Sequence, residues 1–274
     1  MATAALVLAL VSAVIHALWN LLTARSRDSE AALAIAMTLG PLLAIPLAIA
    51  TWRVDAEAVP YLLLSGSLEL TYMVLLGRAY RAAEMSLVYP IARGMAPVFV
   101  LAAGWLLLGQ SVAPLSALGI GVVALGVVLV RGFRGGGSLR HVFLALTIAG
   151  VIASYTLVDS VGLRYANPIP YAVLITGIPG AILVTWIAWR DGPARIRAAA
   201  TPSIALAGVS TIAAYGLVLA ALRLAPAAMV SAVRETSVVF GTALAAIVLH
   251  ERVDRTRIAG ALLVTLGVIL VVVG

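Results

Sequence analysis

Long apolar runs alternate with short polar breaks along the whole sequence. A transmembrane helix needs about 20 mostly apolar residues, and the breaks carry charge, proline or glycine, as in residues 25–30 and 190–193. Open strands cannot span lipid, and no alternating ten-residue pattern indicates a barrel. We therefore expect an all-α integral membrane fold of ten transmembrane helices, at residues 2–23, 31–51, 60–80, 85–109, 114–131, 141–162, 168–189, 202–222, 226–250 and 256–274.

The composition supports a membrane protein and excludes several kinds of chemistry. Hydrophobic residues make up 63% of the 274 positions and charged residues 11%, against about 45–50% and 25% in soluble domains. The chain has no cysteine and no lysine, and its three histidines, His16, His141 and His250, are far apart. Disulfides, thiolate metal sites and a Walker-type phosphate loop are therefore excluded. Without a nucleophile elbow or ligands at metal spacing, we expect no enzyme activity, no cofactor and no metal.

The net charge of +7 comes from arginines that gather in alternate loops. Since basic residues collect in cytoplasmic loops, we interpret the charge as a topology signal and expect no nucleic-acid partner. The bias predicts a multi-pass protein of the bacterial inner membrane with both termini in the periplasm. The loops after the odd-numbered helices carry thirteen arginines, Arg25, Arg27, Arg78, Arg81, Arg131, Arg134, Arg140, Arg190, Arg195, Arg197, Arg252, Arg255 and Arg257, and the other loops carry three, Arg53, Arg164 and Arg223.

The two halves of the chain repeat one another. Residues 79–99 align with residues 221–240 with one gap, which matches Arg81 with Arg223 and Arg93 with Arg234. The repeat predicts a five-helix unit over residues 1–133, a glycine-rich cytoplasmic linker at 134–140, and a second five-helix unit over 141–274. Because five is odd, the second unit enters the membrane from the opposite side. Such inverted repeats build transporters whose substrate site lies near the midplane between the halves.

These residues resemble a known family. The segments His16–Asn20, Ser86–Gly94, Tyr155–Asp159 and Ala232–Ser237, with Leu249–Arg252 before the last helix, are similar to the EamA-type branch of the drug/metabolite transporter superfamily. The resemblance covers essentially the whole chain. It implies ten helices in two inverted halves and secondary active transport, often export, of small metabolites such as amino acids.

Five charged residues fall inside predicted helices: Glu69, Arg93, Asp159, Arg234 and Glu235. A charge near the bilayer centre costs at least about 2.5–3.5 kcal/mol, so each is a candidate functional residue. The guanidinium groups of Arg93 and Arg234 suit a carboxylate or phosphate. Two interpretations remain open: both arginines bind the substrate, or each pairs with Glu69 or Glu235 and holds helices together.

Other polar and aromatic residues accompany these charges. Ser86 and Tyr89 share a helix face with Arg93, and Ser231 and Ser237 form the corresponding stripe beside Arg234. This face either lines a cavity or is filled by a neighbouring helix. The remaining candidates for the substrate site are Trp19, Asn20, Tyr72 and Tyr155.

Coupling to an ion requires a group that can change its protonation state. Glu69, Glu235 and Asp159 are the candidate proton carriers, in that order, and His16 titrates near neutrality in water. Competing interpretations exist for two of them. Asp159 lies close to Arg164, which favours an interfacial ion pair, and a single histidine in an apolar helix is more often a hydrogen-bonded packing residue.

The sequence thus predicts a secondary transporter, an exporter of a small anionic or zwitterionic metabolite such as an amino acid, acting by alternating access around a midplane site. The expected partners are a small-molecule substrate, a coupling ion such as the proton, and the lipid bilayer. The alternative is a flippase for a lipid-linked carrier, or its accessory subunit.

Overall fold

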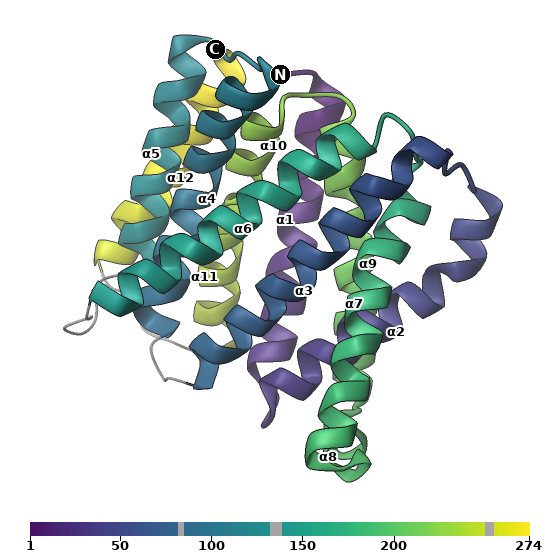
Figure 1. The fold of residues 1–274 in the computed structure, drawn as a ribbon. Helices are drawn as coiled ribbons and strands as arrows, with labels where there is room; N and C mark the ends of the chain where they lie inside the picture. Colours follow the sequence, from purple (N-terminus) through teal and green to yellow (C-terminus); the bar gives the residue numbers. More distant parts are fainter. Residues whose placement is uncertain (82–84, 132–138, 250–254) are drawn as a thin grey trace.

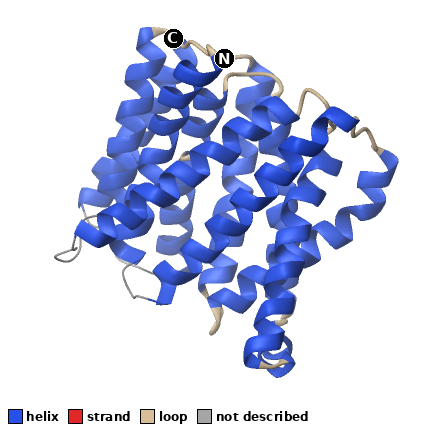
Figure 2. Ribbon diagram, in the orientation of Figure 1, coloured by secondary structure: helices blue, strands red, loops and turns tan. Residues whose placement is uncertain are grey.

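The computed structural model describes residues 1–81, 85–131, 139–249 and 255–274, without the side chains of residues 24, 77–81, 85–90, 131, 242 and 245–249. The described residues form helices and no β-strand (Figures 1 and 2). The helices are α1 (Thr3–Ala24), α2 (Ser29–Ala50), a 3₁₀ turn (Ala56–Ala58), α3 (Val59–Arg81), α4 (Met85–Leu108), α5 (Pro114–Arg131), α6 (Leu139–Gly162), α7 (Pro168–Asp191), α8 (Pro193–Ala199), α9 (Pro202–Leu222), α10 (Ala227–Arg234), α11 (Thr236–Leu249) and α12 (Arg255–Val273).

Among these described residues, eight helices are long and apolar enough to cross a membrane, and Pro114–Val130 of α5 is a shorter apolar helix. Over the predicted span at 226–250 the helix is interrupted at Glu235 and continues as α11. Around the interruption the Val238 amide donates to the Glu235 carbonyl, and the Glu235 amide to the Ala232 carbonyl, each three residues back. The all-α fold is therefore confirmed, while the count of ten spans stays a prediction. Most of the predicted linker at 134–140 lies outside the described residues, and the boundaries of the two units also stay predictions.

The two halves pack through equivalent helices that run in opposite directions. Helices α5 and α12 pack together so closely that their backbones touch at glycines. A Cβ atom on Gly119 would lie 2.6 Å from the Gly267 carbonyl oxygen, and one on Gly126 would lie 2.8 Å from the Gly260 carbonyl oxygen. Side chains at these positions would clash, so the glycines allow close helix approach. Since 119 meets 267 and 126 meets 260, the two helices are antiparallel, as an inverted repeat requires.

Helices α2 and α7 form a second antiparallel pair between the halves. Gly180 lies against the Met37 backbone and Gly177 against Pro41. The remaining contacts between the halves are also reciprocal: α1 packs on α9 where α6 packs on α3, and α4 packs on α6 where α11 packs on α1. The interface between the halves therefore contains residues from both copies of the repeat.

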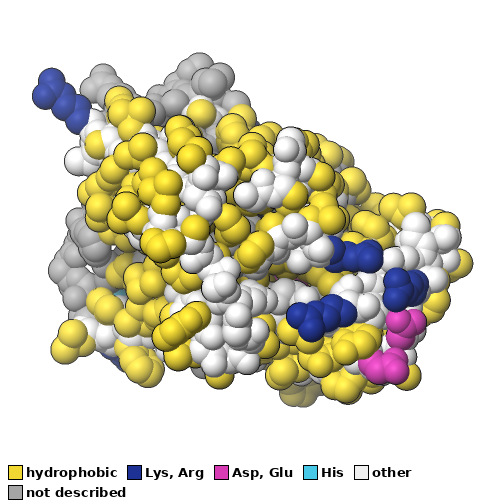
Figure 3. Space-filling model, turned by 90° about the horizontal axis from the view of Figure 1, so that it is seen from above, with side chains coloured by type: hydrophobic (Ala, Val, Ile, Leu, Met, Phe, Trp, Pro, Cys, Tyr) yellow, Lys and Arg dark blue, Asp and Glu magenta, His cyan; other side chains and the backbone are white. Residues whose placement is uncertain are grey.

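The outer surface and the two ends differ in chemistry. Large apolar side chains such as Leu43, Leu107 and Phe143 are exposed on the outside, as expected for a surface in contact with lipid. Both termini lie at one end of the bundle (Figure 1). Seen from that end, hydrophobic side chains dominate and few charged side chains are visible (Figure 3). The helix ends with most of the described arginines, including Arg25, Arg195 and Arg255, lie at the opposite end.

Candidate substrate site between the two halves

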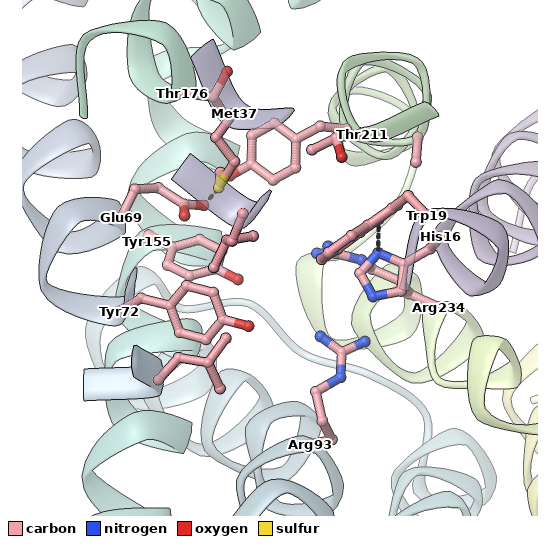
Figure 4. A pocket seen from close by; sticks show the side chains of 14 residues that line it. His16, Trp19, Met37, Glu69, Tyr72, Arg93, Tyr155, Thr176, Thr211 and Arg234 are labelled. Carbon is pink, nitrogen blue, oxygen red and sulfur yellow. Dashed lines mark hydrogen bonds between the residues drawn. The ribbon is translucent and has the colours of Figure 1, made fainter. Parts of the chain in front are cut away.

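A cavity with charged and aromatic side chains in its lining lies between the two halves of the bundle. We call it the central cavity. In Figure 4, Glu69 and the rings of Tyr72 and Tyr155 lie on one side, and Trp19, His16 and Arg234 lie on the other. Helices of both halves contribute its lining, which consists of His16, Trp19, Leu33, Met37, Glu69, Tyr72, Leu76, Arg93, Tyr155, Thr176, Thr211, Ala214, Tyr215 and Arg234.

A second cavity adjoins the central cavity on the side of the termini. Four residues line both cavities: Arg93, Tyr155, Tyr215 and Arg234. The volume is about 40 Å³ for the central cavity and about 10 Å³ for the second. A single water needs roughly 10–15 Å³, so neither cavity holds a metabolite in this conformation. The rest of the second cavity is lined by Ile152, Thr156, Asp159, Val218, Leu222, Val230, Ser231 and Glu235.

Arg93 forms a buried ion pair between the two halves. Its Nη2 lies 3.0 Å from Glu235 Oε1, and the two side chains are only 4% and 3% exposed. Arg93 belongs to α4, whereas Glu235 directly follows α10. The interpretation that an arginine pairs with Glu235 and holds helices together therefore describes Arg93.

Arg234 lies in a different environment from its repeat equivalent. Its guanidinium carbon lies 5.8 Å from the centre of the Tyr215 ring, within the range of a cation–π interaction. No ion pair to Arg234 is found among the described residues, and its buried Nε has no hydrogen-bond partner there. Within the described residues Arg93 thus has a carboxylate partner, whereas Arg234 has an aromatic one.

Two buried carboxyl groups meet at one hydroxyl group. The Tyr215 hydroxyl oxygen lies 2.9 Å from Glu69 Oε1 and 2.8 Å from Asp159 Oδ2. The Ser65 hydroxyl donates to Asp159 Oδ1 at 2.5 Å. These residues come from α3, α6 and α9, and the exposed fraction of each is between 0% and 7%. The predicted ion pair of Asp159 with Arg164 is wrong: within the described residues Asp159 contacts Ser65 and Tyr215 instead.

The remaining aromatic and titratable residues of the cavity are held by contacts with one another. The Trp19 Nε1–H group donates to His16 Nδ1 at 3.1 Å, so this His16 nitrogen is an acceptor without a proton. Tyr72 and Tyr155 pack edge to face, with ring centroids 6.1 Å apart. No three His, Asp or Glu side chains of the described residues are grouped closely enough to hold a metal ion.

The structure brings most of the predicted site residues to the two cavities and leaves others elsewhere. Asn20 donates to the His16 carbonyl of its own helix, and Ser237 is buried, and neither lines the two cavities. The side chains of Ser86 and Tyr89 lie outside the described residues. The central cavity is lined by Arg93, Arg234, Trp19, Tyr72, Tyr155, Glu69 and His16, and the second cavity also by Ser231, Glu235 and Asp159.

The most important residue that the sequence reasoning missed is Tyr215. It contacts Glu69, Asp159 and Arg234, although its sequence neighbours are apolar or small. The repeat contains a signal that points to it. The offset that matches Arg81 with Arg223 carries Tyr72 to Ala214, adjacent to Tyr215.

Comparison with known proteins identifies the family. The sequence model of the EamA-like transporter family matches this chain twice, over residues 3–132 and 139–273. The chain belongs to the EamA-like transporter family. It is thus a multi-pass membrane transporter of the drug/metabolite type, from a family of transporters rather than enzymes.

Solved structures support the fold of this EamA-like chain. One protein crystal structure superposes with a TM-score of 0.77 over 98% of this chain and 95% of the other, at 16% sequence identity. At that identity the likeness shows the fold alone. A comparison with curated proteins found no match.

Proposed function

We propose that this chain is a secondary active transporter of a small zwitterionic metabolite, of which an amino acid is the simplest example. The observation that carries the proposal is the polarity of the central cavity. A carboxyl group stands on one wall and a guanidinium group on the opposite wall, between the two inverted halves (Figure 4).

The two walls fit the two charged ends of a zwitterion. Glu69 lies beside Tyr72 and Tyr155, and carboxylates and aromatic faces both attract an ammonium group. Arg234 has no ionic partner among the described residues and lies across the cavity from Glu69. A guanidinium group binds a carboxylate through two parallel hydrogen bonds. An anionic substrate without an ammonium group would leave Glu69 unmatched, so a zwitterion fits better.

The size of the cavity and the helix interruption support alternating access. The central cavity has too little volume for a metabolite in this conformation, so binding requires movement of the surrounding helices. The interruption at Glu235 places Arg234 and Glu235 at the junction of α10 and α11. Discontinuous helices at the midplane are a common feature of transporters in which one repeat moves against the other.

The distribution of arginines supports the proposed orientation. The described helix ends that carry arginines, including Arg25, Arg140, Arg195 and Arg255, lie at one end of the bundle and the termini at the other. By the positive-inside rule, the arginine-rich end faces the cytoplasm and both termini face the periplasm of a bacterial inner membrane. Export remains the direction that we propose, by analogy with the family.

A ligand screen tests this proposal. We expect free amino acids to raise the thermal stability of the purified protein, by about 2.7 kcal/mol at a hundred times the dissociation constant. Arg234→Gln should weaken that binding roughly 10–100-fold, because it removes a charge-assisted hydrogen bond of about 1.5–3 kcal/mol. The matched control is Arg223→Gln, at an exposed arginine where α9 ends.

Three results would contradict the proposal. Equal stabilisation of the wild type and of Arg234→Gln would remove Arg234 from the site. Stabilisation by dicarboxylates alone would indicate an anionic cargo. Stabilisation only by lipid-linked phosphate carriers would favour the flippase alternative.

A further inference from the structure

We propose that Glu69, Tyr215 and Asp159 form a proton-sharing triad, in which the Tyr215 hydroxyl passes a proton between two carboxyl groups that face different cavities. The inference deepens the proposed function, on which its role in transport rests, by assigning the coupling ion and the path of that ion. The geometry around the Tyr215 hydroxyl favours one shared acid proton in the triad.

The number of hydrogens at Tyr215 determines the protonation state. A tyrosine hydroxyl carries one hydrogen, so it donates one hydrogen bond, and an ionised carboxylate only accepts. Tyr215 lies within hydrogen-bond distance of an oxygen of Glu69 and an oxygen of Asp159. If both were ionised, one of these contacts would place two acceptor oxygens against each other. Both contacts are hydrogen bonds only when one carboxyl is protonated and donates to the Tyr215 oxygen.

The surroundings of the triad also favour one shared proton. If Glu69 and Asp159 were both ionised, their negative charges would repel each other strongly, because little water is present to screen them. A single acid proton on one of the two carboxyl groups removes that repulsion. Ser65 can donate to Asp159 whichever carboxyl carries the proton. The other charged or titratable side chains near the triad come from the surrounding helices: His16 of α1, Arg93 of α4, Tyr155 of α6, Tyr171 of α7, Arg234 of α10 and Glu235 at the helix interruption.

The two carboxyl groups line different cavities. Glu69 lines the central cavity, which extends to Leu33 near the start of α2 and Leu76 near the end of α3, at the arginine-rich end. Asp159 lines the second cavity, which extends to Leu222 at the end of α9, on the side of the termini. Tyr215 lines both cavities and therefore lies where they adjoin.

Proton transfer through the triad is balanced. When Glu69 is the acid, its O–H group donates to the Tyr215 oxygen and the Tyr215 O–H group donates to the Asp159 carboxylate. Transfer breaks the O–H bonds of Glu69 and Tyr215 and forms new O–H bonds on Tyr215 and Asp159. Tyr215 is unchanged, and the proton has moved from the central cavity to the second cavity. No oxidant or further reactant is required.

Infrared spectroscopy of the purified protein tests the triad without a substrate. We expect the wild type at neutral pH to show the carbonyl stretch of one buried carboxylic acid, which shifts in heavy water. This band should be lost in Glu69→Gln and in Asp159→Asn. In each variant the new amide donates to the Tyr215 oxygen, so the remaining carboxyl needs no proton. Glu57→Gln, at an exposed carboxyl, is the matched control and should keep the band.

Tyr215→Phe, which removes a single oxygen atom, tests the triad even if a carboxyl variant does not fold. Tyr215→Phe should move the acid band from its wild-type frequency, because the acid loses its acceptor, whereas the control Tyr61→Phe, outside the two cavities, should not. The inference is overturned if the wild type lacks the band. It is also overturned if the band survives both carboxyl variants or keeps its frequency in Tyr215→Phe.

Transport assays in proteoliposomes connect the triad with coupling. With an amino acid found in the ligand screen, Asp159→Asn should lose accumulation driven by a pH gradient and should retain exchange of the same amino acid across the membrane. Retention of gradient-driven accumulation would exclude the triad as the coupling site. If no amino acid stabilises the protein in the ligand screen, the proposed function is contradicted. The infrared result would still decide the protonation of the triad.

Discussion

Two ionic clusters join the halves of this protein, one in the interior of the bundle and one at the arginine-rich end. In the interior, Arg93 pairs with Glu235 and both side chains are almost fully buried. At the arginine-rich end, Arg195 of α8 contacts Asp28 and Glu30, with Nε–Oδ2 and Nη2–Oε2 distances of 2.6 Å and 2.9 Å, and these side chains are 13–29% exposed.

The two clusters differ in whether water can solvate their charges after the ion pairs break. If the cluster at the arginine-rich end opens, water solvates the separated charges, and such pairs contribute little to stability. A buried charge that loses its partner has no such replacement. An ion pair between the halves can therefore open at low cost at the end of the bundle, whereas in the buried interior each charge has to exchange its partner for another one.

The largest expected effect is at the buried pair. Glu235→Gln should lower the free energy of unfolding by about 3–5 kcal/mol, because it leaves the Arg93 charge buried without its carboxylate. Denaturant titration in mixed micelles measures the loss. The double variant Arg93→Gln/Glu235→Gln removes both charges and should recover most of it. A double variant as unstable as Glu235→Gln would mean that the pairing itself is not the cause.

A smaller effect is expected at the arginine-rich end. Arg195→Gln should cost about 1 kcal/mol, in the range of partly exposed ion pairs. The effect of salt should distinguish the two clusters, because exposed charges are screened more strongly than buried ones and the Debye length falls to about 3 Å at 1 M salt. The difference between Arg195→Gln and wild type should shrink in 1 M salt, whereas the difference for Glu235→Gln should not. Equal salt sensitivity would show that the clusters do not differ in solvation.

The smallest effect concerns pH. The hydrogen bonds from Arg195 hold the pKa of Asp28 below its ordinary value. A lowered folded-state pKa contributes stability above the unfolded value, near 3.9, which is lost as the pH falls through the folded-state pKa. The difference in Tm between wild type and Arg195→Gln should therefore be constant near neutrality and narrow below about pH 4. A difference that is constant down to pH 3 would contradict this origin.

The fold could be predicted largely from the sequence, and the site only in part. The lengths of the apolar runs and the repeat predicted the all-α fold, but not the interruption within residues 226–250. Residues 226–250 are apolar enough to predict one continuous helix, yet the helix is interrupted at Glu235, beside the ion pair that Glu235 forms with Arg93. Nothing in the local sequence indicates this partner.

What the sequence by itself determined is the class of this protein: an inverted repeat of apolar helices with charges too costly to be accidental in lipid. What only the tertiary structure decided is how those charges are partnered. Arg93 and Arg234 are equivalent in the repeat, yet Arg93 meets Glu235 and Arg234 lies over Tyr215. Hydrophobic burial is local and can be read from composition, whereas a hydrogen bond between α3, α6 and α9 depends on where three distant segments meet. Tyr215 belongs to the site because α3, α6 and α9 meet at its hydroxyl group.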